Sequence, residues 1–108
     1  MTYRVDLTER AARDLRATYL AINGPESRQA RTWFDGLERA ILGLADLPAR
    51  GTITAEDENL RHLLYGSRRD AWRIIYSIDA PNHVVTVLHI RHGARDRFAT
   101  EDAKDPGV

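Results

Sequence analysis

The spacing of the apolar residues changes at residue 60, and this change constrains the fold more than any other feature of the chain. Between residues 12 and 47, apolar residues recur every three or four positions, as on one face of an amphipathic helix. After residue 60, they alternate with polar residues or form short continuous runs, as in β-strands. The 108 residues therefore form one domain with a helical first half and a β-rich second half.

The first half is predicted to contain a short strand and two helices. Residues 2–7 alternate apolar and polar side chains, which indicates a half-buried strand. Thr8 is a suitable N-cap for a first helix, which the following Asn-Gly pair stops. Pro25 fits the first turn of a second helix, and Pro48 ends that helix. The short connection between the helices predicts an antiparallel hairpin.

The second half is predicted to be an antiparallel meander of three strands joined by short turns. These strands cover residues 60–65, 71–78 and 83–92. A loop at 48–59 precedes them, and its acidic run at 56–58 is typical of a solvated loop.

The order β-α-α-β-β-β predicts an α+β fold, with the helical hairpin packed on one face of a mainly antiparallel sheet. The first strand is expected to pair somewhere in the meander. We expect residues 1–98 to form the domain and residues 99–108 to form a polar C-terminal tail.

The composition excludes several classes of protein. The chain has no cysteine, so it can form neither a disulfide framework nor a cysteine-based zinc site. It has no apolar stretch of membrane-spanning length and no signal peptide, which predicts a cytoplasmic protein. Glycine-rich phosphate loops, nucleophile elbows and HExxH motifs are absent from the sequence. We expect neither a metal nor a cofactor.

The zero net charge hides a basic segment. Residues 60–98 contain seven Arg and three Asp, an excess of four positive charges. Guanidinium groups suit bidentate contact with phosphate or carboxylate groups. The alternative is that these arginines form a solvated face of the sheet.

Arg73 is the most informative of these arginines, because it lies mid-strand between apolar neighbours. A guanidinium group there must be paired or face a solvent-filled groove. One interpretation is a structural ion pair with Asp70 or Asp96. The other is a phosphate ligand that meets Arg95 in a solvent-open hollow on the sheet face away from the helices. His92, at the exit of the last strand, is positioned for acid–base chemistry near neutral pH.

The strand WRIIY and the closing segment LHIRHGARD, in the β-α-α-β-β-β order, resemble the RelE/ParE superfamily of type II toxin–antitoxin toxins, which includes plasmid stabilisation proteins. The resemblance spans residues 3–98. It implies a growth-inhibiting toxin and a cognate antitoxin, part of which folds on binding. It leaves open whether the toxin forms a homodimer or a heterotetramer with the antitoxin.

Two activities occur in this superfamily. RelE-like members are ribosome-dependent, metal-free endonucleases that cut mRNA, and ParE-like members poison DNA gyrase. By resemblance, Arg73 falls on the arginine of the family's YR strand, and Arg95 falls on the arginine after the family's glycine, here Gly93. With His92 in proton transfer, they are the catalytic residues that a RelE-like activity implies. The arginines expected to bind nucleic acid are Arg61, Arg68, Arg69, Arg91 and Arg97.

The chain also departs from the RelE-like pattern. The lysine pair before the YR strand is absent, and Lys104 is the only lysine. The C-terminal catalytic tyrosine is missing, since Phe98 begins the sequence Phe-Ala-Thr-Glu. The first expectation is a ribosome-dependent mRNA endoribonuclease. The alternatives are a ParE-like gyrase poison and a non-toxic member that only binds its antitoxin.

Overall fold

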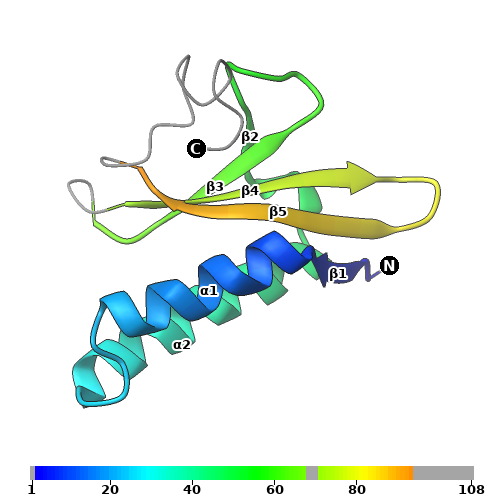
Figure 1. Ribbon diagram of the computed structural model, residues 1–108. Helices are drawn as coiled ribbons and strands as arrows, with labels where there is room; N and C mark the ends of the chain where they lie inside the picture. Colours follow the sequence, from blue (N-terminus) through cyan, green and yellow to red (C-terminus); the bar gives the residue numbers. More distant parts are fainter. Residues whose placement is uncertain (1, 68–70, 94–108) are drawn as a thin grey trace.

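The computed structural model describes residues 2–67 and 71–93. Two helices lie side by side against a five-stranded sheet (Figure 1). The elements are β1 (Arg4–Leu7), α1 (Glu9–Ala21), α2 (Arg28–Leu42), the 3₁₀ turns η1 (Gly43–Ala45) and η2 (Pro48–Arg50), β2 (Thr52–Ile53), β3 (Arg61–Tyr65), β4 (Trp72–Asp79) and β5 (Val84–His92). This arrangement confirms the predicted α+β class.

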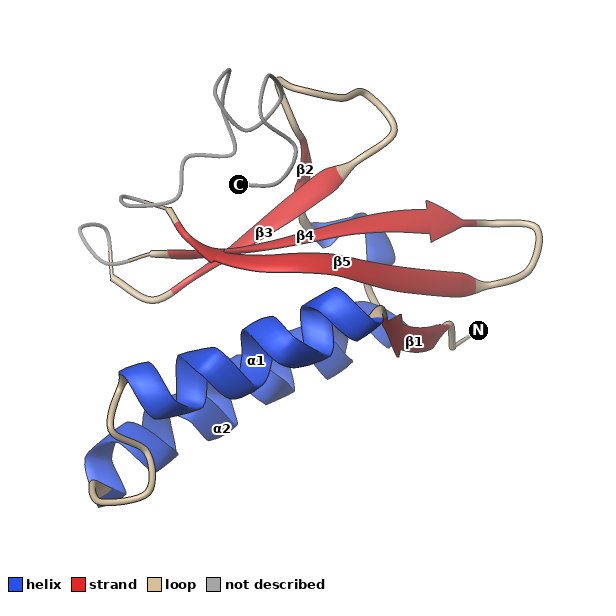
Figure 2. Cartoon of the chain, in the orientation of Figure 1, coloured by secondary structure: helices blue, strands red, loops and turns tan. Residues whose placement is uncertain are grey.

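The sheet has the strand order β1-β5-β4-β3-β2. Strands β3, β4 and β5 form the predicted antiparallel meander. The first strand, β1, pairs with the last strand, β5, in parallel. Both helices cover the same face of the sheet (Figure 2), so the predicted one-sided packing is also confirmed.

The helix boundaries follow capping side chains. Thr8 caps α1 as predicted, and its hydroxyl group accepts a hydrogen bond from a backbone N–H in the first turn. The second helix begins at Arg28, because Ser27 caps it in the same way. The prediction that this helix begins around Pro25 is therefore wrong. The helix also ends earlier than predicted, at Leu42, and continues as the 3₁₀ turn η1.

The core lies between the helices and the sheet. The helical layer contributes Ala11, Leu37, Ile41 and Leu44, and the sheet contributes Leu63, Ile74, Tyr76, Val85, Val87 and Ile90. Burying these apolar side chains provides the main free energy that holds the helices on the sheet.

Strand β5 contains a bulge that changes which side chains face the helices. Ile75 pairs with His89 while the next residue, Tyr76, pairs with Val87, so Leu88 is one extra residue on β5. The alternation of side chains along β5 therefore shifts by one position at Leu88. As a result, Val87 and Ile90 both belong to the core.

The segment predicted as a loop at 48–59 contains two short elements, η2 and β2. The buried Tyr76 hydroxyl group donates to the Pro48 carbonyl at 2.7 Å and accepts from the Gly51 N–H at 2.9 Å. Arg61 donates to the Gly51 carbonyl at 2.7 Å. These contacts come from distant strands, so the local sequence carried no signal for β2.

Candidate functional site

A polar cluster lies on the sheet face opposite the helices. It contains His62 from β3, Arg73 from β4, and His89 and Arg91 from β5. Arg73 and Arg91 are direct cross-strand partners, and Ile75 has His62 and His89 as its partners on either side. Cross-strand partners share a face of the sheet, so the register brings these polar side chains together.

Arg73 is held by two described side chains. Its Nε donates to Nδ1 of His62 at 2.9 Å. Its two terminal nitrogens donate to the two carboxylate oxygens of Glu56 at 3.3 and 3.4 Å. The side chain of Arg73 is 12% exposed and that of Glu56 is 21% exposed. An ion pair is thus present at Arg73, but its described partner is Glu56.

This geometry changes two expectations from the sequence. Asp70 and Asp96, the expected partners of Arg73, lie outside the described residues. The expected solvent-open hollow is wrong for the described part of the cluster, because Arg73 is 12% exposed in its side chain and Arg91 only 6% exposed. Within the described residues, Glu56 and His62 contact the guanidinium group of Arg73.

A tight turn positions Glu56. The buried Thr54 hydroxyl group donates to the Asp57 carbonyl at 2.8 Å and accepts from the Asp57 N–H at 3.0 Å. The Thr54 N–H also donates to the Leu60 carbonyl at 2.9 Å. Glu56 therefore projects from a turn that is closed by its own hydrogen bonds. Residues 55–59 are exposed, as expected for a solvated loop, and the carboxylate of Glu56 also pairs with Arg73.

The surroundings of His62 favour its neutral form. Burial lowers the pKa of His62 below its usual value of 6.5, and the positive charge of Arg73 lowers it further, while Glu56 opposes the shift. Because Nδ1 accepts the hydrogen bond from Arg73, the proton of neutral His62 lies on Nε2. His62 acts here as an acceptor that orients Arg73.

His92 lies on the other side of the sheet. Its cross-strand partner is Trp72, and their rings meet edge to face with centroids 5.0 Å apart. His92 is 6% exposed. Trp72 packs against the hydrophobic core while Arg73 points to the opposite face. The structure therefore does not bring His92 and Arg73 together.

The other predicted residues are divided between the described and undescribed parts of the chain. Arg61 contacts the carbonyl groups of Ala49 and Gly51, away from the polar cluster. Arg91 lies beside Arg73. The remaining predicted residues, Arg68, Arg69, Arg95 and Arg97, lie outside the described residues.

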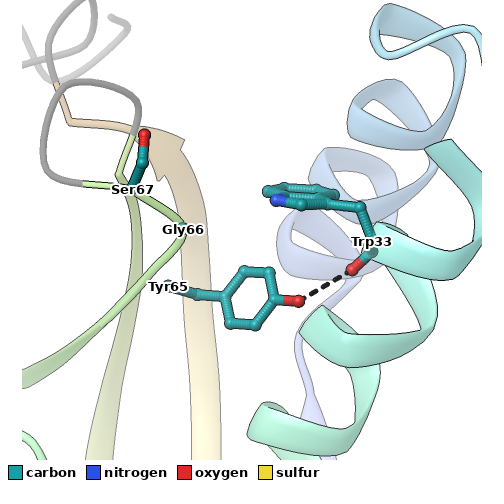
Figure 3. Close-up of a pocket in the computed structure, with 4 residues that line it drawn as sticks. All are labelled: Trp33, Tyr65, Gly66 and Ser67. Atoms are coloured by element: carbon teal, nitrogen blue, oxygen red, sulfur yellow. Dashed lines mark hydrogen bonds between the residues drawn. The ribbon is translucent and has the colours of Figure 1, made fainter. Parts of the chain in front are cut away.

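A separate pocket of about 510 Å³ opens between α2 and the end of β3 (Figure 3). Trp33, Tyr65, Gly66 and Ser67 line it. The Tyr65 hydroxyl group donates to the Trp33 carbonyl at 2.9 Å, which holds the helix to the strand. The Trp33 ring packs against the core and also contributes to this wall.

Within residues 2–67 and 71–93, no three His, Cys, Asp or Glu side chains are grouped so that they could hold a metal ion. No helix in the same ranges is long and apolar enough to span a membrane.

Sequence reasoning missed Glu56 and His62 as members of the cluster. The alternation in β3 puts His62 on the polar face of its strand, so the pattern held a signal for it. Glu56 lies 17 residues from Arg73 in a loop, and no periodic pattern predicts that contact.

Comparisons with known proteins agree with the fold. Residues 5–97 match the family model described as the ParE toxin of the type II toxin-antitoxin system parDE. No curated protein sequence matches the chain.

Several solved structures are similar to it. The chromosomal ParDE toxin–antitoxin system of P. aeruginosa has a chain that is 20% identical, with a TM-score of 0.64, over 84% of this chain and 96% of that one. The RelBE2 toxin–antitoxin complex of Mycobacterium tuberculosis has a chain that is 23% identical, with a TM-score of 0.60, over 85% and 99% of the two chains. A free mutant of the E. coli toxin RelE is 17% identical, with a TM-score of 0.63, over 97% and 98%.

The predicted RelE/ParE resemblance is thus confirmed by a family model over most of the chain and by the shared fold. This chain belongs to the ParE toxin family of type II toxin–antitoxin systems.

Proposed function

We propose that this toxin arrests growth by binding DNA gyrase and does not cut mRNA itself. The observation that carries the proposal is the separation of Arg73 from His92, which lie on opposite faces of the sheet. Poisoning of gyrase is the activity that the resemblance to ParE-like toxins implies. Such a toxin needs a binding surface and no acid–base pair of its own.

The described polar cluster lacks the arrangement that RNA cleavage needs. A metal-free ribonuclease requires a base for the 2′-OH, a cation for the phosphorane and an acid for the leaving oxygen. His62 has its accepting nitrogen occupied by Arg73. His92, the predicted group for proton transfer, lies on the opposite face of the sheet. The absence of the lysine pair from the sequence argues in the same direction.

We also propose that a cognate antitoxin binds this chain in the cytoplasm. The P. aeruginosa and M. tuberculosis relatives are described as members of toxin–antitoxin systems or complexes. Light scattering of the co-expressed pair would distinguish a heterotetramer from a simple heterodimer, and the same measurement on the toxin alone would detect a homodimer.

An mRNA endoribonuclease is the second candidate. The adjacency of Arg73 and Arg91 across β4 and β5 favours it, because paired guanidinium groups suit a phosphate. In that case Arg73, Arg95 and His92 remain the proposed catalytic residues, with Arg61, Arg68, Arg69, Arg91 and Arg97 as RNA contacts.

One induction experiment separates the two candidates. The toxin is expressed without an antitoxin, and plasmid supercoiling, gyrase–DNA adducts and mRNA ends are followed from the first minutes. We expect adducts and altered supercoiling while mRNA stays intact, and a host with resistant gyrase should keep growing. Codon-associated mRNA cuts that precede any change in supercoiling would overturn the proposal in favour of the endoribonuclease. Unimpaired growth of the sensitive host would identify a non-toxic member.

A further inference from the structure

We propose that the guanidinium group of Arg73 is a carboxylate-exchange site. Glu56 occupies it in the free chain, and an acidic side chain of a protein partner replaces Glu56 when that partner binds. This inference adds a recognition site to the proposed function. It rests on the proposed function only in assuming that the partner is a protein.

The first argument is the geometry of the resident carboxylate. Both oxygens of Glu56 meet both terminal nitrogens of Arg73, which is the two-pronged arrangement that guanidinium groups make with carboxylates. The site is thus already shaped for a planar group with two oxygens. An incoming Asp or Glu side chain can take the same position without any change in Arg73.

The second argument is that Arg73 is oriented without help from Glu56. Its Nε is bound to Nδ1 of His62 at 2.9 Å, on a different edge of the guanidinium group from the two nitrogens that face Glu56. The arginine is also anchored in the middle of β4, between β3 and β5. When Glu56 leaves, the two terminal nitrogens stay aimed in the same direction.

The third argument is that the resident pair is loose. Its two contacts are 3.3 and 3.4 Å long, whereas charge-assisted N–H···O hydrogen bonds are typically about 2.7–2.9 Å. The turn that carries Glu56 is closed by hydrogen bonds among Thr54, Asp57 and Leu60. Glu56 can therefore move away while its turn remains folded.

The fourth argument favours a carboxylate over nucleic-acid phosphate. The chain has a formal net charge of zero, so it lacks the overall positive field that draws proteins to nucleic acids. The local charge differs, because Arg91 lies beside Arg73. A short-range site for single acidic side chains fits this combination of a neutral protein and a small basic centre.

The test uses the full-length chain labelled with ¹⁵N and an acetylated hexaglutamate peptide as the probe. Binding is followed by the NMR signal of the Arg73 Nε–H. The variant Glu56→Gln is compared with Glu58→Gln, which removes the same charge from the same loop two residues away. Since a partly exposed ion pair competes with the peptide, we expect Glu56→Gln to bind it about fivefold more tightly than the wild type, and Glu58→Gln to match the wild type.

Three outcomes would overturn the proposal. The first is equal affinity for all three proteins. The second is peptide binding that leaves the Arg73 signal unchanged. The third is a single-stranded RNA oligonucleotide that gains more affinity from Glu56→Gln than the peptide does, since that would assign the site to phosphate.

A second variant guards against misfolding of the first. Glu56→Asp keeps the charge but shortens the side chain, so its carboxylate no longer reaches Arg73, and it should also bind the peptide more tightly. Urea unfolding verifies that each variant is folded. Gyrase poisoning is measured separately, so a failure of carboxylate exchange would leave the proposed target untouched and is distinguishable from failure of that proposal.

Discussion

The carboxylate of Asp14 on α1 accepts a hydrogen bond from the backbone N–H of Ile90 on β5, over 3.1 Å and 76 residues of sequence. Nearby, the Thr8 hydroxyl group donates to the carbonyl of Leu88, the extra residue of the bulge. A bulge leaves backbone groups without their partners in the ladder. The pairing of β1 with β5 also ends at Leu7 and Val87. Thr8 and Asp14 supply partners for backbone groups of β5 beyond that end, and they tie the first helix to the last strand.

Replacing Asp14 should therefore destabilise the protein. Asp14→Ala leaves the Ile90 N–H without its acceptor, and we expect the free energy of unfolding to fall by about 1–3 kcal/mol. Urea denaturation measures the change. Asp14→Asn keeps an acceptor oxygen and should recover part of the loss, and Asp35→Ala, on the exposed surface of α2, should change stability by less than about 0.5 kcal/mol. Equal losses for Asp14→Ala and Asp35→Ala would contradict this role.

The stability of the protein should depend on the protonation of His62. Its pKa is lowered in the folded state from the usual value of 6.5, first by burial and then by Arg73. The unfolded chain therefore binds this proton more readily, so the stabilising contribution is complete above pH 6.5 and is lost as the pH falls through the lower folded pKa. A protonated His62 can no longer accept from Arg73.

Urea midpoints between pH 5 and pH 7.5 test this dependence. His62→Gln keeps an acceptor for Arg73 but cannot take up the proton, so its stability should fall less on acidification than that of the wild type. His83→Gln, in the turn before β5, serves as the control. If His62→Gln and the wild type lost stability in parallel, His62 would not be the group responsible.

The Tyr76 hydroxyl group should contribute strongly to stability, because it bridges the carbonyl of Pro48 and the N–H of Gly51. Tyr76→Phe leaves the buried Gly51 N–H without this acceptor, and we expect a loss of about 1–3 kcal/mol in urea denaturation. Tyr3→Phe removes the same atom from a half-buried ring and should cost less. A midpoint for Tyr76→Phe within error of the wild type would show that water replaces the hydroxyl group.

Gly36 should resist substitution although it lies inside α2. A Cβ atom built at Gly36 would clash with the Tyr65 hydroxyl oxygen. Alanine normally stabilises a helix by about 1 kcal/mol relative to glycine, but here we expect Gly36→Ala to lower the thermal midpoint. In a Tyr65→Phe background the clashing oxygen is gone, so the same change should cost less or stabilise. Additive effects of the two substitutions would contradict the close contact.

Much of the fold could be predicted from the sequence, because periodicity reports which face of an element is buried. The apolar stripe of α1, its cap at Thr8 and the alternation in β4 are local features of this kind. The start of α2 at Arg28 was missed because Pro25 suits a first helical turn, whereas the capping hydrogen bond of Ser27 sets the actual start.

The candidate site was less predictable, because its contacts depend on tertiary structure. The face carrying Arg73 followed from strand alternation and the strand order. His92 and Arg73 lie on opposite faces of the sheet because of the pairing of β4 with β5. Glu56 reaches Arg73 because of the turn at Thr54. Neither relationship is encoded within a single stretch of sequence.

The parallel pairing of β1 with β5 has a consequence for synthesis of the toxin. The first strand cannot find its neighbour until the ribosome has made nearly the whole chain, and contacts between distant residues form slowly. A nascent chain arrested after β4 should therefore be digested readily by a protease, and protection should rise only once β5 has left the exit tunnel. The toxin would then fold only after its last strand has been translated. Until that point the newly made polypeptide is unfolded and harmless to the cell.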